Sequence, residues 1–231
     1  MKKLRNVAIT SMLLCSTNSF AAFNADAILG PTFKTVAENL VAATSYKAVA
    51  PGEPLGITGF DIGAEASVTS VKGAADLAAA FGTDISIIPT AKLHVHKGLP
   101  MGIDVGAVWM PEIQGISFWG GELRYSFVSG NIALPAVAVR GAYTKFSASP
   151  LSVSNTSVEA TVSKGLLMFT PFLGIGNVWG NASVTGLTDQ KPSFFKWFAG
   201  LNMNMGLMNL AYEMDNTGGF TTHSGKLGFR F

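Results

Sequence analysis

From residue 55 to the end of the chain, apolar and polar residues alternate with a period of two over ten successive segments. In the first of these segments, Ile62 and Val68 fall on one face, whereas Asp61 and Glu65 fall on the other. A period of two is that of a β-strand with two chemically different faces. The segments also reach the ~9–11 residues that a tilted strand needs to cross a bilayer. The pattern therefore predicts ten strands, each with one apolar and one polar face.

Alternation does not say which face points inward, because a soluble barrel shows the same pattern with its apolar face at the core. The spacing between the segments favours a membrane barrel, in which short turns at one end alternate with longer loops at the other. The predicted short turns are residues 97–100, 129–132, 164–165 and 205–207, and the predicted longer loops are residues 72–86, 110–116, 147–155, 180–192 and 216–222.

The aromatic residues on the apolar face fall into two sets at opposite ends of the strands. The set beside the longer loops is Trp109, Trp119, Tyr143, Trp179 and Tyr212, and the other set is Phe60, Tyr125, Phe127, Phe169, Phe229 and Phe231. Two such belts match the two interfaces of a bilayer. We therefore predict an all-β fold, a closed antiparallel up-and-down transmembrane β-barrel of about ten strands with a short N-terminal amphipathic helix.

The chain before the barrel divides into two parts. Residues 1–21 combine a cationic start, a short apolar stretch and small residues at the end, which is the pattern of a secretory signal peptide. Residues 22–54 are predicted as a periplasmic N-terminal segment with a helix over residues 31–47, and residues 55–231 as the barrel. A helix of this length is too short to span a bilayer. It is a candidate plug, lid or interfacial element.

Composition narrows the class of protein further. Charged residues make up 13% of the chain, against about 25% in typical soluble domains. The excess of cations resides in the predicted signal peptide; without it, 13 Lys and Arg stand against 14 Asp and Glu. The charge therefore gives no reason to expect a nucleic-acid partner. The sole cysteine, Cys15, also lies in that segment, so the mature chain has no thiol chemistry.

The chain ends in "GKLGFRF", with Leu227, Phe229 and Phe231 on the apolar face of the last strand. This ending resembles the C-terminal sorting signal of bacterial outer-membrane proteins. The resemblance implies an outer-membrane location, recognition by the barrel-assembly machinery and pairing of the last strand with the first. The stretches "GFDIG", "KGLPMGIDVG" and "GLMNLAYE" also resemble a proteobacterial group of small barrels without an assigned function.

The polar face of the predicted barrel collects nearly all of its charge in a near-balanced set. This predicts a network of ion pairs in the lumen, because buried charges are costly unless they are paired or hydrated. The predicted network consists of Asp61, Glu65, Lys92, His94, His96, Asp104, Glu122, Arg124, Arg140, Glu159, Lys196, Glu213, Lys226 and Arg230, with Asp215 on the same face. His94 and His96 are open to three interpretations, as network partners, a pH switch or a metal chelate.

Three functions remain on the sequence alone. The favoured one is a narrow channel or selective passage for small solutes, and the alternative is a non-conducting structural or adhesion barrel that acts through its loops. An outer-membrane enzyme is less favoured, since no nucleophile, base and orienting group come together in the pattern. His223 falls in a loop or on the lipid-facing side. We expect no catalytic residues, metal or cofactor; the expected partners are the lipid bilayer and small solutes.

Overall fold

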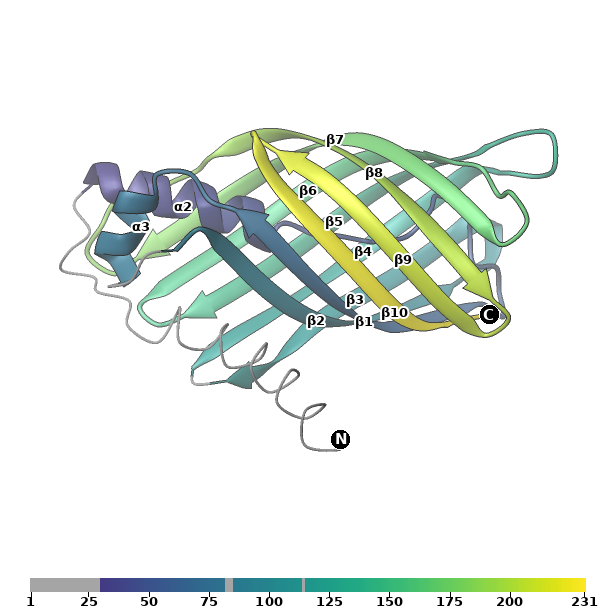
Figure 1. Cartoon of the computed structure of the whole chain (residues 1–231), viewed down its shortest axis with the longest axis horizontal. Coiled ribbons are helices and arrows are strands. Elements are labelled where there is room, and N and C mark those ends of the chain that lie inside the picture. Colours follow the sequence, from purple (N-terminus) through teal and green to yellow (C-terminus); the bar gives the residue numbers. More distant parts are fainter. Residues whose placement is uncertain (1–29, 82–84, 114) are drawn as a thin grey trace, which may run out of the picture.

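The computed structural model describes residues 30–81, 85–113 and 115–231. The predicted signal peptide, residues 1–21, lies outside the described residues. The described chain forms a closed barrel of ten strands with two helices at one end (Figure 1). The elements are α2 (Gly30–Thr44), β1 (Phe60–Ser70), α3 (Ala74–Phe81), β2 (Ile87–Gly98), η2 (Pro100–Gly102), β3 (Ile103–Ile113), β4 (Ile116–Ser129), β5 (Ala136–Ala148), β6 (Leu151–Ser163), β7 (Phe169–Val184), β8 (Ser193–Met205), β9 (Met208–Thr217) and β10 (Phe220–Arg230).

Each strand pairs antiparallel with its neighbours in the sequence, and β10 pairs with β1 to close the barrel. At this seam Ile62 lies opposite Phe229. The amide of Phe60 donates to the carbonyl of Phe231 at 2.7 Å, and the amide of Phe231 donates back at 3.0 Å. Closure leaves no strand edge in the hydrocarbon, where an unpaired backbone would be costly. The predicted fold class is confirmed.

The barrel is apolar outside and polar inside. Leu123, Val158 and Leu173 on the outer surface are more than half exposed, whereas Lys196 and Glu213 inside are fully buried. A soluble barrel has the reverse distribution, with its apolar side chains at the core. The outer surface is therefore suited to contact with hydrocarbon, which is the arrangement of a transmembrane β-barrel. Among the described residues, no helix has the length and hydropathy to cross a membrane.

Two inward phenylalanines occupy the space above glycines on the neighbouring strand. Phe172 on β7 lies opposite Gly200 on β8, and Phe198 on β8 lies opposite Gly174 on β7. A Cβ atom added to Gly174 or Gly200 would lie 2.2 Å from the Cζ atom of the facing ring. These glycines therefore let two large rings fit inside the barrel.

The predicted alternation of short turns and longer loops is wrong. Three of the predicted longer loops, residues 110–116, 147–155 and 216–222, are mostly strand, and only two residues separate the end of β5 at Ala148 from the start of β6 at Leu151. The strands continue here with polar residues opposite each other, such as Ser147 opposite Ser152. The strand therefore extends beyond the point where apolar and polar residues cease to alternate. Long connections remain between β1 and β2 and between β7 and β8.

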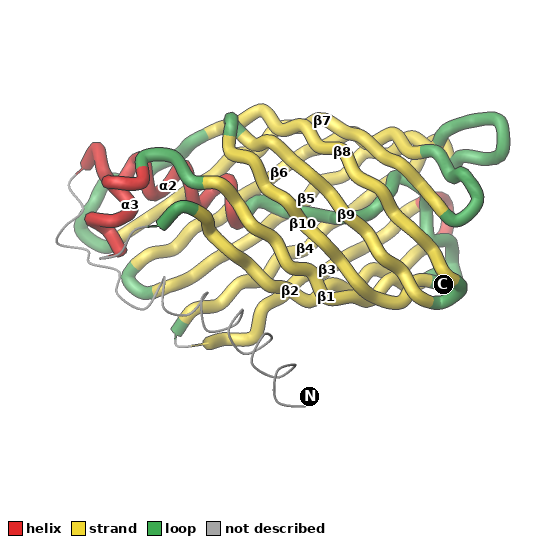
Figure 2. The backbone as a smooth tube through the Cα atoms, viewed as in Figure 1, coloured by secondary structure: helices red, strands yellow, loops and turns green. Residues whose placement is uncertain are grey.

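Part of the chain before β1, residues 45–55, lies inside the barrel. Helix α2 sits at the end where β1 finishes, and Asn39 is bonded to the backbone of Lys72 in both directions at 2.9 Å. From Thr44 the chain runs through the lumen to the opposite end, where β1 begins (Figures 1 and 2). The periplasmic location of residues 22–54 stays a prediction. Wall side chains bind the backbone of residues 45–55, and hydrophobic periodicity does not report such contacts.

Candidate functional site: a strap through a charged lumen

The predicted residues lie on the expected sides of the wall. Every member of the predicted lumen network faces inward and is buried, except Arg230, whose side chain is 10% exposed. The aromatic residues Trp109, Trp119, Tyr143, Trp179 and Tyr212 are on the outer surface, as are Leu227, Phe229 and Phe231. Trp119 packs against Tyr143 with 5.6 Å between ring centroids.

One group of ion pairs crosses the middle of the barrel. Glu159 on β6 accepts from Lys196 on β8 at 2.9 Å and from Arg140 on β5. Arg140 also lies 3.5 Å from Glu122 on β4. Each of these side chains points inward from a different strand, so their contacts hold four strands in register from within. The charges are compensated where water is scarce.

Further ion pairs join neighbouring strands of the wall. Asp61 pairs with Lys226 across the seam at 2.8 Å, and Arg124 Nη2 lies 2.6 Å from Asp104. Glu65 pairs with Lys92 at 2.8 Å and also contacts His94. These are local pairs between strands, and they leave the centre of the lumen to the N-terminal segment.

Residues 45–55, which we call the strap, occupy that centre. Its first half is held by charged wall residues: Lys47 Nζ lies 3.0 Å from Asp215 Oδ1, and the amide of Val49 donates to Glu213 Oε2 at 3.2 Å. Lys196 donates to the carbonyl of Tyr46 at 2.8 Å. The Lys47 contact also accounts for the end of α2 at Thr44, three residues before the predicted end, because the chain must leave the helix to reach Asp215.

The second half of the strap is held mainly through its backbone. Arg124 Nη1 donates to the carbonyl of Pro51 at 2.7 Å. Gly52 donates to Ser163 Oγ at 3.1 Å and accepts from Ser126 Oγ at 2.8 Å. The amide of Leu55 donates to Asp104 Oδ1 at 3.1 Å. Wall side chains thus satisfy strap backbone groups that would otherwise be buried without partners.

The strap also balances the charge of the wall, because it brings one more cation into the lumen. Seven acids and six Lys or Arg residues point inward from the strands. Lys47 of the strap adds a seventh cation. Glu53, the other charged residue of the strap, is half-buried, and its carboxylate lies close to Gly165 in the turn after β6. Sequence reasoning missed Lys47, although the excess of one acid in the predicted wall was a signal that a cation was lacking.

The histidines are in contact with other network members. His94 contacts Glu65, and His96 Nε2 lies 3.2 Å from the Tyr46 hydroxyl and 3.5 Å from Glu122. Within the described part of the chain, no group of three or more His, Cys, Asp or Glu side chains is arranged to hold a metal ion. His223 lies on the outer surface of β10, where its Nδ1 atom is 2.7 Å from the Tyr212 hydroxyl.

The closed barrel, its apolar outer surface and its paired internal charges define an integral transmembrane β-barrel. No family model matches the chain, and no curated protein sequence matches it.

Three solved structures are similar to the chain. They are the N-terminal β-barrel domain of Pseudomonas aeruginosa OprF (13% identity, 74% of this chain and 97% of that chain, TM-score 0.39), the KdgM porin in complex with disordered oligogalacturonate (8% identity, 74% and 99%, TM-score 0.39), and Neisserial surface protein A (11% identity, 74% and 95%, TM-score 0.32). At these identities the likeness concerns the fold alone.

Proposed function

We propose that the protein is a narrow passage for small solutes whose lumen is held closed by the strap. The observation that carries the proposal is the course of residues 45–55 through a lumen lined by ionised side chains. Apolar side chains would stabilise a permanently packed barrel interior at least as well, because buried ion pairs often contribute no net stability. A charged wall that holds the strap through hydrogen bonds and an ion pair is instead suited to exchange these contacts for contacts with water.

The wall also suggests a preference among solutes. When the strap detaches from the wall, Asp215 loses Lys47 as its partner and Glu213 loses the amide of Val49. The remaining wall carries seven acids against six Lys and Arg residues. A narrow, low-dielectric passage with excess negative charge favours cations. We therefore expect the open form to conduct cations better than anions.

The proposal is tested by single-channel recording in planar bilayers. The full chain is expected to be closed for most of the record. Lys47→Glu places a third carboxylate beside Asp215 and Glu213, so like-charge repulsion should release the strap and lengthen the open time at least tenfold. Lys34→Glu is the matched control, because the Lys34 side chain is 68% exposed on α2, and it should leave the record unchanged.

A deletion of residues 23–50 provides the decisive arm of the same experiment. This variant should show steady, cation-preferring steps once circular dichroism confirms its β-structure. A folded deletion variant that passes no ions would contradict the channel. That result would support the second candidate, a non-conducting structural or adhesion barrel. The balanced charge of the lumen with Lys47 in place favours that candidate, as do the two helices gathered at one end.

For the orientation, we propose that the end with α2 and α3 faces the cell exterior. Leu227, Phe229 and Phe231 lie on the outer surface, and Phe231 packs against Phe60 at the start of β1, at the opposite end. Their resemblance to a sorting signal supports contact with the barrel-assembly machinery at the periplasmic side. In that orientation, solutes from outside meet α2 before they meet the strap.

A further inference from the structure

The wall of the barrel has a gap between β2 and β3. The ladder between these strands ends at the pair Leu93 and Trp109, although β2 begins at Ile87 and β3 continues to Ile113. On its other side β2 stays paired with β1 to its first residue, Ile87. One stretch of the wall therefore has no ladder between its strands, at the end of the barrel where α2 lies.

The gap follows from the sequence of the two strands. Each carries a proline in the stretch without a ladder: Pro111 lies two residues beyond the last pair on β3, and Pro89 lies four residues beyond it on β2. Proline has no amide hydrogen to donate to a ladder and is confined to edges and bulges of sheets. On its other side β3 also shifts register against β4, between Met110 and Ile113. Each strand thus has a local reason to leave the ladder here.

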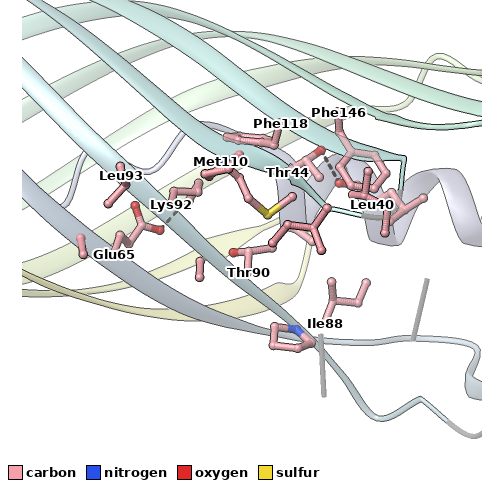
Figure 3. Close-up of a pocket in the computed structure, with 17 residues that line it drawn as sticks. Leu40, Thr44, Glu65, Ile88, Thr90, Lys92, Leu93, Met110, Phe118 and Phe146 are labelled. Carbon is pink, nitrogen blue, oxygen red and sulfur yellow. Dashed lines mark hydrogen bonds and ion pairs between the residues drawn. The ribbon is translucent and has the colours of Figure 1, made fainter. Parts of the chain in front are cut away.

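A cavity of about 310 Å³ lies at this gap, and its lining comes from both surfaces of the wall (Figure 3). Ala91 and Leu93 belong to the lipid-facing surface, whereas Phe118 and Phe146 point inward and are buried. Leu40 of α2 forms part of the inner wall. A cavity lined from both sides passes through the wall, so it connects the hydrocarbon around the barrel with the face of α2.

The lining is almost entirely apolar. The ionisable side chains at the cavity, Glu65 and Lys92, pair with each other at 2.8 Å. Lys92 Nζ also lies 5.4 Å from the centre of the Phe118 ring. Ordered water needs two to four polar partners, and most of this surface provides none. An occupant made of hydrocarbon would make the dispersion contacts that an empty cavity forfeits.

We propose that this cavity binds an unbranched aliphatic chain, which enters sideways from the membrane through the gap between β2 and β3. The volume falls within the range of small-molecule sites, roughly 300–1,000 Å³, and the opening faces the phase in which such chains reside. Two molecules present this chemistry, a phospholipid with its acyl chain and a free fatty acid. The bound chain packs against Leu40, so it contacts the helix that leads into the strap.

Photolabelling of the full-length protein in phospholipid vesicles tests the proposal. One arm uses a phospholipid with a diazirine near the end of one acyl chain, and the other uses a fatty acid with the same group. After irradiation, peptide mass spectrometry should find label on the inward residues Phe118 and Phe146. Label from the phospholipid identifies an intact lipid as a source, and label from the fatty acid alone identifies a free chain. Label confined to lipid-facing residues in both arms would overturn the proposal.

Two matched variants test the route of entry. Ala91→Phe places a ring at the mouth of the gap and should reduce the label on Phe118 and Phe146 at least fivefold. Ala160→Phe makes the same change on the lipid-facing surface of β6, away from the cavity, and should leave that label unchanged. An equal yield in the two variants would refute entry through the gap. Met110→Phe, which fills the cavity from β3, repeats the test if Ala91→Phe does not fold.

Discussion

Lys47 is the residue on which the closed lumen most depends. Its ammonium group has three hydrogens, and it contacts three oxygen acceptors: Asp215 Oδ1 at 3.0 Å, Ser45 Oγ at 2.7 Å and the carbonyl of Ala42 at 3.1 Å. The side chains of Lys47 and Asp215 are both fully buried. Such a pair adds little net stability, but the loss of one partner leaves a charge without compensation.

We expect Lys47→Met to lower the free energy of unfolding by about 3–5 kcal/mol, because it leaves Asp215 charged and unpaired inside the barrel. Urea titration in detergent micelles, followed by circular dichroism, measures the change. Lys34→Met on the exposed face of α2 is the control and should have little effect. The double variant Lys47→Met with Asp215→Asn should recover much of the loss, and equal effects of the two single lysine variants would contradict the role of the pair.

At the scale of elements, the seam between β1 and β10 requires two glycines. Gly63 and Gly228 lie opposite each other across it. A Cβ atom added to Gly228 would lie 2.1 Å from the carbonyl oxygen of Ile62 and 2.6 Å from the Cα atom of Gly63. Both are backbone atoms of β1, so no side-chain rotation relieves the clash. The seam closes at this spacing because neither strand carries a Cβ there.

Gly228→Ala should therefore destabilise the folded barrel by roughly 1–3 kcal/mol, the usual range for overpacking. Gly225→Ala is the matched control on the same strand, since nothing lies within 4 Å of the Cβ atom that it adds. The two variants can be compared by urea titration in the same micelles. Equal stability of the two proteins would mean that β1 and β10 separate enough to admit a methyl group.

Much of the barrel wall was predictable from the sequence, but the course of the strap inside it was not. The inward positions of Glu65 and Lys196 follow from a period of two, which is a property of each strand alone. The course of the strap depends on contacts such as that of Arg124 with the carbonyl of Pro51. These contacts join distant segments and produce no periodic pattern in the sequence. The gap beside Pro89 likewise became visible only when the register of β2 and β3 was known.

At the scale of the whole molecule, the reversed distribution of apolar and polar side chains leads to an optical prediction. The chain has four tryptophans, and all lie on the outer surface, with exposed fractions of 43% for Trp109, 52% for Trp119, 47% for Trp179 and 40% for Trp197. In vesicles this surface is covered by lipid. A bilayer therefore shields all four rings from the aqueous phase.

We expect lipids with brominated acyl chains to quench most of the tryptophan fluorescence, and aqueous iodide to quench little of it. The urea-unfolded chain is the control and should show the opposite response. Strong iodide quenching of the reconstituted protein, or a mature chain that stays dissolved without detergent, would show that the apolar surface does not face lipid.

The position of the strap also constrains the order of assembly. The strap joins α2 at one end of the lumen to β1 at the other, and β1 forms one side of the seam. If the seam formed first, a folded helix would have to be drawn through a finished ring of ten strands. The simpler sequence of events is that the sheet curls around residues 45–55 and then joins β10 to β1. A segment that is enclosed while the barrel forms needs no opening wide enough to admit it.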